Sequence, residues 1–228
     1  MAAAGANVVL AARRTRLTEE IAQAIAEDGG AAIAVPMDVT DGTSVAEAFS
    51  LAEDRFGSVD TVVANAGISR YGRSIEVAEA EVRQVIDTNL LGVHLTASEA
   101  ARRMIAAGSR ETGAGRIVII GSITAQLTGQ GDAAYAASKA GVAHLARQFA
   151  REWVRLGINV NTVQPGYIRT ELVGDWFDSE GGRAQIAGWH RRRIMAIDAL
   201  DEMVLYLCSE RAAHLTGSTI TIDDGQSL

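Results

Sequence analysis

The chain has little cysteine and little proline: one cysteine, Cys208, and two prolines stand among its 228 residues. A single cysteine excludes an intrachain disulfide and leaves no cysteine-rich metal site, and we interpret Cys208 as a small buried apolar residue. The histidines show no paired spacing with cysteine, aspartate or glutamate that would predict a metal site, so we expect no bound metal. They are His94, His144, His190 and His214.

Long apolar runs and basic stripes are also missing. No uncharged apolar run approaches the roughly 20 residues that span a bilayer, and the alanine-rich start lacks the charged region and apolar stretch of a signal peptide. The net charge is -7, which argues against nucleic acid and an anionic membrane surface as partners. We therefore expect a soluble, cytoplasmic protein, and the cysteine content agrees with that compartment.

Hydrophobic residues make up 48% of the chain, enough for one sizeable core. Short apolar runs alternate with longer helical patterns, which is typical of βαβ units around a parallel sheet. The expected strands are residues 8–10, 32–35, 61–63, 117–120 and 159–163. Two long helices are expected at residues 79–107 and 133–156. The sequence therefore predicts a single α/β domain over residues 1–228.

The segment Tyr135-Ala-Ala-Ser-Lys139 places a phenol and an ammonium group four residues apart. On a helix, positions i and i+4 share a face, so the two side chains should project side by side. A nearby ammonium group favours the phenolate and lowers the tyrosine pKa from about 10, which suits proton transfer at a carbonyl or alcohol oxygen. Ser122 follows an apolar run and Gly121, at the point where a strand should end.

Three further motifs accompany these residues. Gly121-Ser122 and Tyr135-x-x-x-Lys139 resemble the active-site signature of the short-chain dehydrogenases/reductases, and the other motifs stand in the order of that family. They are Asn65-Ala66-Gly67, Asp87-Thr88-Asn89 and Pro165-Gly166-Tyr167-Ile168-Arg169-Thr170. The resemblance implies a Rossmann-like, doubly wound parallel sheet.

The same resemblance implies an oxidoreductase that moves hydride between a nicotinamide dinucleotide and a carbonyl or secondary alcohol. Tyr135 would exchange the proton with the substrate oxygen, and Ser122 would hydrogen-bond that oxygen. Lys139 would lower the tyrosine pKa and hold the cofactor ribose, while Asn89 would hold a water of the proton path. Each residue alone has a structural explanation, such as a cap for Ser122, but the whole pattern favours an active site.

The choice of cofactor depends on Arg13 and Arg14, which follow the first expected strand. NAD-preferring doubly wound proteins place an acid here, whereas arginine suits bidentate pairing with a 2′-phosphate. NADP is therefore favoured over NAD, although both arginines could simply begin the next helix. Asp38-Val39 resembles the adenine-contacting pair, and Asp38 could equally cap a turn. The other expected cofactor contacts are Asn65, Ala66, Gly67, Tyr135, Lys139, Pro165, Gly166, Ile168 and Thr170.

Residues 171–195 break the helical periodicity and mix glycines with aromatic residues. Glycines permit hinge conformations and aromatics cover apolar ligands, so we expect a substrate lid. The alternative is a helical excursion packed on the surface. The expected substrate contacts, which favour a bulky or apolar ligand, are Ile123, Gln126, Leu127, Trp176 and Phe177.

Members of the family begin with a strand, a glycine-rich turn and a helix, about 25 residues that the sequence does not show before Met1. In the strand order 3-2-1-4-5-6 that strand is central. We therefore expect its neighbours to pair directly or another segment to fill the gap. We also expect weak cofactor binding, because the glycine-rich turn binds the pyrophosphate.

Two functions stay open. The first is the oxidoreductase, with either a misplaced start or a shortened version of a longer protein. The second is a truncated, catalytically silent Rossmann-like protein with an oligomerisation or regulatory role. The resemblance also implies a homodimer or homotetramer built from the long helices near Asn89 and Lys139 and from the C-terminal strand.

Overall fold

The computed structural model of the chain describes residues 1–170 and 172–228. Every strand pair in the described residues is parallel, and helices separate the strands along the chain, so the α/β class predicted from the sequence is confirmed. The strands are β1 (Asn7–Ala12), β2 (Ala31–Pro36), β3 (Thr61–Ala64), β4 (Gly115–Ile120), β5 (Ile158–Pro165) and β6 (Thr219–Ile222).

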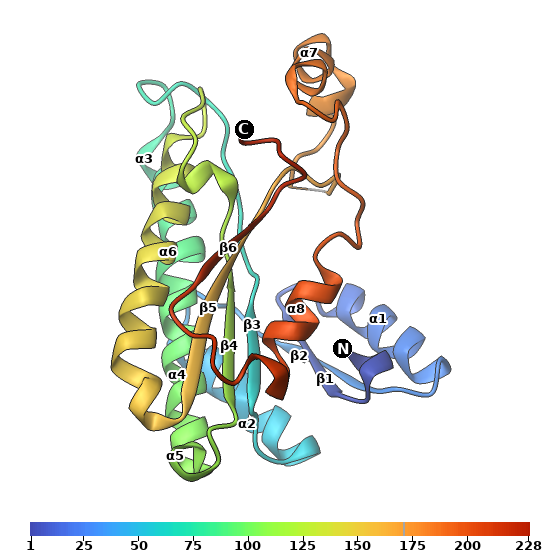
Figure 1. Ribbon diagram of the computed structural model, residues 1–228, viewed down its shortest axis with the longest axis vertical. Coiled ribbons are helices and arrows are strands. Elements are labelled where there is room, and N and C mark those ends of the chain that lie inside the picture. Colours follow the sequence, from blue (N-terminus) through green and yellow to red (C-terminus); the bar gives the residue numbers. More distant parts are fainter. Residues whose placement is uncertain (171) are drawn as a thin grey trace.

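The helices form layers on both sides of the strands (Figure 1). Helices α4 and α6 cover one face of the sheet that contains β4 and β5, and α8 lies on the other side. The helices are α1 (Thr15–Glu27), α2 (Gly42–Phe56), α3 (Glu79–Ile86), α4 (Gly92–Ala106), α5 (Ser109–Thr112), α6 (Ala133–Trp153), α7 (Glu180–Gly188) and α8 (Asp201–Leu207).

Strand β4 joins the two halves of the core because successive side chains point to opposite faces of a sheet. Ile117 and Ile119 pack with α4 and α6 in the larger cluster, whereas Val118 packs with Leu207 of α8 in the smaller one. All three strand residues are almost completely buried. The sequence of this strand is continuously apolar because helices cover the strand on both faces.

The parallel strands belong to two separate sheets. Strand β1 pairs only with β2, while β3, β4, β5 and β6 pair in that order in a second sheet. Within the described residues, β1 and β3 neither pair with each other nor share an intervening strand. The expectation that the gap would close by direct pairing or be filled by another segment is therefore wrong.

Helix α2 explains why the two sheets do not close onto each other. Its buried Val45 and Phe49 share one core cluster with Val93 and Ala97 of α4, and the same helix also lies against β2. Moving β1 onto β3 would draw α2 away from α4. Each large apolar side chain exposed in that way would cost about 1.5–3 kcal/mol.

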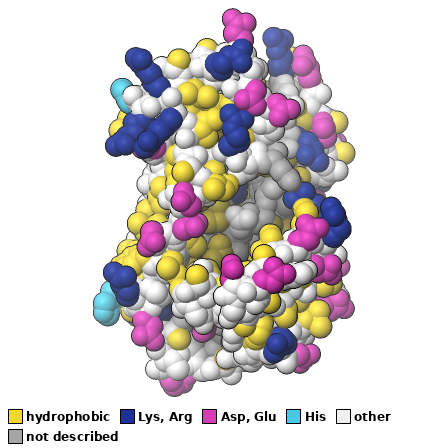
Figure 2. Space-filling view, turned by 90° about the vertical axis from the view of Figure 1, so that its right-hand side faces the viewer, with side chains coloured by type: hydrophobic (Ala, Val, Ile, Leu, Met, Phe, Trp, Pro, Cys, Tyr) yellow, Lys and Arg dark blue, Asp and Glu magenta, His cyan; other side chains and the backbone are white. Residues whose placement is uncertain are grey.

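Charged side chains of both signs are mixed on the face shown in Figure 2, without a continuous basic stripe. The same face is hollowed near its middle, below the part that carries α7. Among the helices of the described residues, none combines the length and the apolar character needed to cross a membrane.

Candidate active site

The residues predicted to carry the chemistry follow the carboxyl ends of parallel strands. Asn65 follows β3, Ser122 follows β4, and Pro165 ends β5. The carboxyl ends of parallel strands lie at one edge of a sheet, which is where open α/β sheets bind ligands. Segments far apart in the sequence therefore meet at one edge of the four-stranded sheet.

Helix α6 brings Tyr135 and Lys139 to this edge, as their spacing predicts. The Lys139 ammonium nitrogen lies 5.7 Å from the centre of the Tyr135 ring. It donates a hydrogen bond of 2.8 Å to the carbonyl oxygen of Ile120, the last residue of β4. A Cβ placed on Gly67 would lie 3.5 Å from the same nitrogen, so the loop after β3 passes directly beside it.

The lowered pKa expected for Tyr135 is wrong for this structure. Burial raises the pKa of Tyr135 to about 12, and the Ser122 hydroxyl beside it lowers that value only in part. Tyr71, Tyr167 and Asp132 raise it further, because each would place negative charge near a phenolate. Tyr135 is therefore a protonated phenol at neutral pH, and in this structure it is a weaker acid than a free tyrosine.

Lys139 is the only lysine in the chain. Burial lowers its pKa to about 8, because a low-dielectric surrounding disfavours the ammonium form. An ammonium group has three donors, and within the described residues its hydrogen bond goes to Ile120. Two donors beside the Gly67 loop fit a pair of ribose hydroxyls, so the site is compatible with the predicted dinucleotide.

Ser122 is a helix cap, one of the structural explanations that its position allowed, and it also lies beside Tyr135. Its oxygen accepts hydrogen bonds from the backbone N–H of Thr124 at 3.2 Å and from the Thr124 hydroxyl at 2.9 Å, so it caps the short helical turn Ile123–Ala125. The same hydroxyl lies beside the phenol of Tyr135. The cap thus fixes the serine oxygen next to the proton donor.

Asn89 holds the loop that follows β3. Its Oδ1 accepts a hydrogen bond of 2.8 Å from the Ile68 N–H, and its Nδ2 donates to the Ile68 carbonyl at 2.9 Å and to the Ser138 hydroxyl at 3.0 Å. Ser138, which the sequence reasoning missed, also donates to the backbone oxygen of Tyr135 at 2.7 Å. Both amide hydrogens are thereby used, and the water-holding role stays a prediction.

The helix around Asn89 differs from the expected one. Residues 79–107 were expected to form one continuous helix, but the π-helical segment Asp87–Leu91 separates α3 from α4. Such segments place one extra residue in a turn and occur frequently at functional sites. This local widening directs the Asn89 amide towards Ile68 and Ser138, and periodicity alone gave no indication of it.

The residues predicted to bind the adenosine half of the dinucleotide lie at the ends of β1 and β2. Asp38 Oδ1 accepts hydrogen bonds from the N–H and the hydroxyl of Thr40 at 2.9 and 2.8 Å, and these bonds lower the pKa of its carboxyl group. Asp38 therefore does cap a turn, and the exposed Arg13 guanidinium lies 3.9 Å from it. Arg14 precedes α1 as its N-cap residue, and Val39 packs against Gly92. None of these observations tests the predicted adenine and 2′-phosphate contacts.

The loop after β5 is held by Gln226, which the sequence reasoning also missed. Its Oε1 accepts a hydrogen bond of 2.6 Å from the Tyr167 N–H, and its Nε2 donates to the backbone oxygen of Arg193 at 3.3 Å. A Cβ on Gly166 would overlap this Gln226 oxygen and would lie 2.8 Å from the Asp223 Cα. Close packing against the end of β6 therefore requires glycine at this position.

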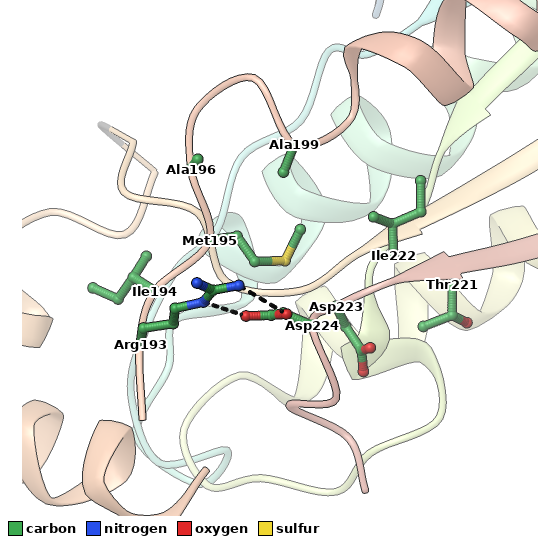
Figure 3. Close-up of a pocket in the computed structure, with 9 residues that line it drawn as sticks. All are labelled: Arg193, Ile194, Met195, Ala196, Ala199, Thr221, Ile222, Asp223 and Asp224. Carbon is green, nitrogen blue, oxygen red and sulfur yellow. Dashed lines mark hydrogen bonds and ion pairs between the residues drawn. The ribbon is translucent and has the colours of Figure 1, made fainter. Parts of the chain in front are cut away.

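A cavity of about 590 Å³ adjoins that loop on the side of β6 (Figure 3). Met195, which lines it, donates its N–H to the Tyr167 oxygen at 3.1 Å and forms a bridge with Ile168. Arg193 and Asp224 both line the cavity and form an ion pair, with 2.6 Å between Nε and Oδ2. The cavity thus lies next to the predicted nicotinamide contact Ile168, whereas Thr170 is exposed.

Two of the expected substrate contacts are wrong because they are buried. Ile123 is 3% exposed and Phe177 is 2% exposed. Phe177 packs edge-on against Tyr167 and Trp189, with ring centres 5.5 and 5.7 Å apart. It therefore holds the segment together from inside and offers no surface to a ligand.

The other expected substrate contacts retain some exposure. Gln126 donates a hydrogen bond of 2.8 Å to Gln164, Leu127 is half-buried, and the exposed Trp176 donates one of 2.8 Å to Gln185. Within residues 171–195 the structure contains the turn Trp176–Asp178 and α7, and Glu171 lies outside the described residues. A lid role for this segment stays a prediction.

Comparison with known proteins identifies the family. A family model described as enoyl-(acyl carrier protein) reductase matches residues 1–227. The chain is 36% identical to cis-4-hydroxycyclohexanecarboxylate dehydrogenase of Sinomonas cyclohexanicum over 91% of this chain and 81% of that protein. It is 33% identical to 3-oxoacyl-[acyl-carrier-protein] reductase of Escherichia coli over 100% of this chain and 90% of that protein.

The chain belongs to the short-chain dehydrogenase/reductase family. A solved gluconate 5-dehydrogenase from Burkholderia cenocepacia, in complex with NADP and tartrate, superposes with a TM-score of 0.92 at 30% identity, covering 99% of this chain and 87% of that one. As a member of this family, the chain is an NAD(P)-dependent oxidoreductase of carbonyl and alcohol substrates.

Proposed function

We propose that this protein is a carbonyl reductase that prefers NADP(H) and uses Tyr135 as its proton donor. The observation that carries the proposal is the meeting of Tyr135, Ser122 and Lys139 at the carboxyl edge of the four-stranded sheet. A phenol whose pKa is about 12 is protonated at neutral pH and therefore carries the proton that a general acid transfers to the carbonyl oxygen.

In the proposed mechanism, Ser122 donates a hydrogen bond to the substrate carbonyl oxygen and positions it beside the phenol. Tyr135 then transfers its proton to that oxygen as negative charge develops there. Lys139, held by the carbonyl of Ile120, places positive charge near the phenolate that remains and binds the ribose hydroxyls. A bound nicotinamide dinucleotide would supply the hydride that the carbonyl carbon takes up.

The preference for NADP(H) is supported by the end of β1. Arg13 is exposed there, and among the described residues its ion-pair partner, Asp38, lies at the long distance of 3.9 Å. Such a pair is weak in water, so the guanidinium can pair with a 2′-phosphate instead. In place of the acid that NAD-preferring proteins carry after this strand, the chain has Arg13-Arg14.

The experiment that tests this function follows the absorbance of NADPH and NADH with a panel of ketones at millimolar cofactor. We expect kcat/KM to be higher with NADPH, and Tyr135→Phe should lower kcat by about 10²- to 10⁴-fold with unchanged cofactor binding. Tyr206→Phe, which removes the same hydroxyl from α8, is the matched control and should keep wild-type activity. If the wild-type protein reduces no ketone, the catalytically silent alternative replaces the enzyme.

We also propose a cytoplasmic homo-oligomer, either a dimer or a tetramer. Apolar side chains of Leu91, at the start of α4, and Val154, at the end of α6, are 42% and 46% exposed, and a second copy could cover them. Sedimentation of the purified chain tests this proposal, since a monomer at micromolar concentration would contradict it.

A further inference from the structure

One carboxylate and two phenols from separate segments lie near Tyr135. Tyr71 follows β3, Asp132 precedes α6, and Tyr167 follows β5. All three contribute to the raised pKa of the Tyr135 phenol, which places them within electrostatic reach of it. They are not part of the proton transfer proposed above.

Backbone geometry supports the same grouping. Asp132 is the N-cap residue of α6 and stands three residues before Tyr135, which lies in the first turn of that helix. The Gly72 N–H donates a hydrogen bond of 2.9 Å to the Gly131 carbonyl, so the loop that carries Tyr71 is tied to the residue before Asp132. Tyr71 and Asp132 therefore border the same approach to the reacting phenol.

Within the described residues, the Asp132 carboxylate neither caps a helix nor forms an ion pair. It occupies the N-cap position of α6, but its side chain makes no capping hydrogen bond. No described side chain donates a hydrogen bond to it, and no described cation pairs with it. A half-buried aspartate without a cap or a counterion is costly to keep, and burial accordingly raises its pKa.

Tyr71 offers an apolar ring beside the polar carboxylate of Asp132. Its side chain is 64% exposed, although a tyrosine ring is largely apolar. A ring face of this kind can cover the carbon skeleton of a ligand, while the neighbouring carboxylate, which only accepts hydrogen bonds, can take one from a ligand hydroxyl. A second carboxylate at the same place would be repelled.

We propose that Asp132 makes this enzyme select uncharged, hydroxylated carbonyl compounds over carbonyl compounds that carry a carboxylate, with Tyr71 covering the ligand skeleton. This inference rests on the proposed carbonyl reduction. Two of the similar proteins are named for carboxylates, cis-4-hydroxycyclohexanecarboxylate and gluconate. The proposed preference for uncharged substrates would distinguish this chain from those two proteins.

The test uses three ketones built on the same ring: 4-hydroxycyclohexanone, 4-oxocyclohexanecarboxylate and 4-methylcyclohexanone, each at saturating NADPH. For the wild-type protein, kcat/KM for the hydroxyl compound should exceed that for the carboxylate by about tenfold or more. Asp132→Asn should lower this ratio by a similar factor. A ratio is the appropriate readout, because any change in the pKa of Tyr135 affects all three ketones alike.

Asp54→Asn, an exposed residue of α2, changes the net charge equally and should leave the ratio at its wild-type value. Tyr71→Leu should raise KM for all three rings while keeping the preference for the hydroxyl compound over the carboxylate. An unchanged ratio in Asp132→Asn, or an equal loss of rate with all three ketones, would overturn the selection by Asp132 and leave the reductase intact. No reduction of any ketone by the wild-type protein would overturn the reductase itself.

Discussion

At the scale of single residues, burial determines how the two titrating groups of the site behave. Tyr135 has its pKa raised to about 12 and Lys139 has its pKa lowered to about 8. Both shifts favour the uncharged form, as expected where desolvation outweighs the attraction between the two groups. The sequence showed which groups stand together, but the degree of burial depends on tertiary packing that spacing does not reveal.

The pKa of Lys139 can be measured without assigning a spectrum. Because the chain has one lysine, a sample labelled with ¹³Cε-lysine gives one resonance, and we expect it to titrate with a midpoint near pH 8. Above that pH the folded protein binds fewer protons than the unfolded chain, until the unfolded lysine also loses its proton near 10.5. The contribution of Lys139 to stability therefore rises between those values and is smallest below pH 8.

The control is the same titration in concentrated denaturant, where the midpoint should return to the ordinary value. A native midpoint above pH 10 would contradict the burial of this amine.

At the scale of elements, the π-helical segment Asp87–Leu91 connects the α3–α4 unit to the active-site edge. Asn89, within it, is completely buried and bonds both backbone groups of Ile68. Removing this amide leaves an N–H and a carbonyl group without partners, at a cost of about 1–3 kcal/mol each. The element thus acts as a clamp on the loop that begins at Asn65.

Replacing the clamp should loosen that loop before it unfolds the protein. In Asn89→Ala we expect faster hydrogen exchange at the Ile68 amide, a lower unfolding temperature and a lower kcat. Gln84→Ala, an exposed change in α3, is the matched control and should leave the Ile68 amide as protected as in the wild type. Equal rates of hydrogen exchange at the Ile68 amide in both variants would show that Asn89 does not position this loop.

The sequence predicted those parts of the fold and the site that depend on local patterns. The strand positions, the parallel arrangement and the motif residues at strand ends all follow from apolar runs and short spacings. The buried orientation of Ile123 and Phe177 could not be predicted in this way, because the side of a turn or short helix that packs inward is set by its neighbours. The Gln226 clamp joins positions 59 residues apart, and no local pattern marks such a contact.

At the scale of the whole molecule, the predicted catalytic residues and the residues predicted to bind the adenosine half of the cofactor lie on two different sheets. The four-stranded sheet carries Ser122, Tyr135 and Lys139, whereas Arg13 and Asp38 belong to the two-stranded sheet. Their relative position depends on α2, because hydrogen bonds between β1 and β3 are absent from the described residues. A dinucleotide that contacts both groups must therefore bridge the two sheets.

This arrangement predicts weak cofactor binding by the 228-residue polypeptide. The described residues contain no glycine-rich turn that leads from a strand into a helix and could bind the diphosphate. We expect a Kd for NADPH above the low-micromolar range in a fluorescence titration. We also expect NADPH to raise the unfolding temperature, since it binds only the folded state. A low-micromolar Kd would contradict the first expectation.

The solitary lysine has a practical consequence for anyone who handles this protein. Reagents that couple dyes, biotin or solid supports to primary amines have only two targets here, the chain terminus and a side chain inside the reaction centre. Conditions alkaline enough for such coupling also leave much of that side chain in its reactive free-base form. Tagging at Cys208 would meet a thiol whose pKa burial raises to about 11. Attachment at the chain terminus therefore leaves the active site unchanged, whereas coupling at Lys139 would inhibit the enzyme.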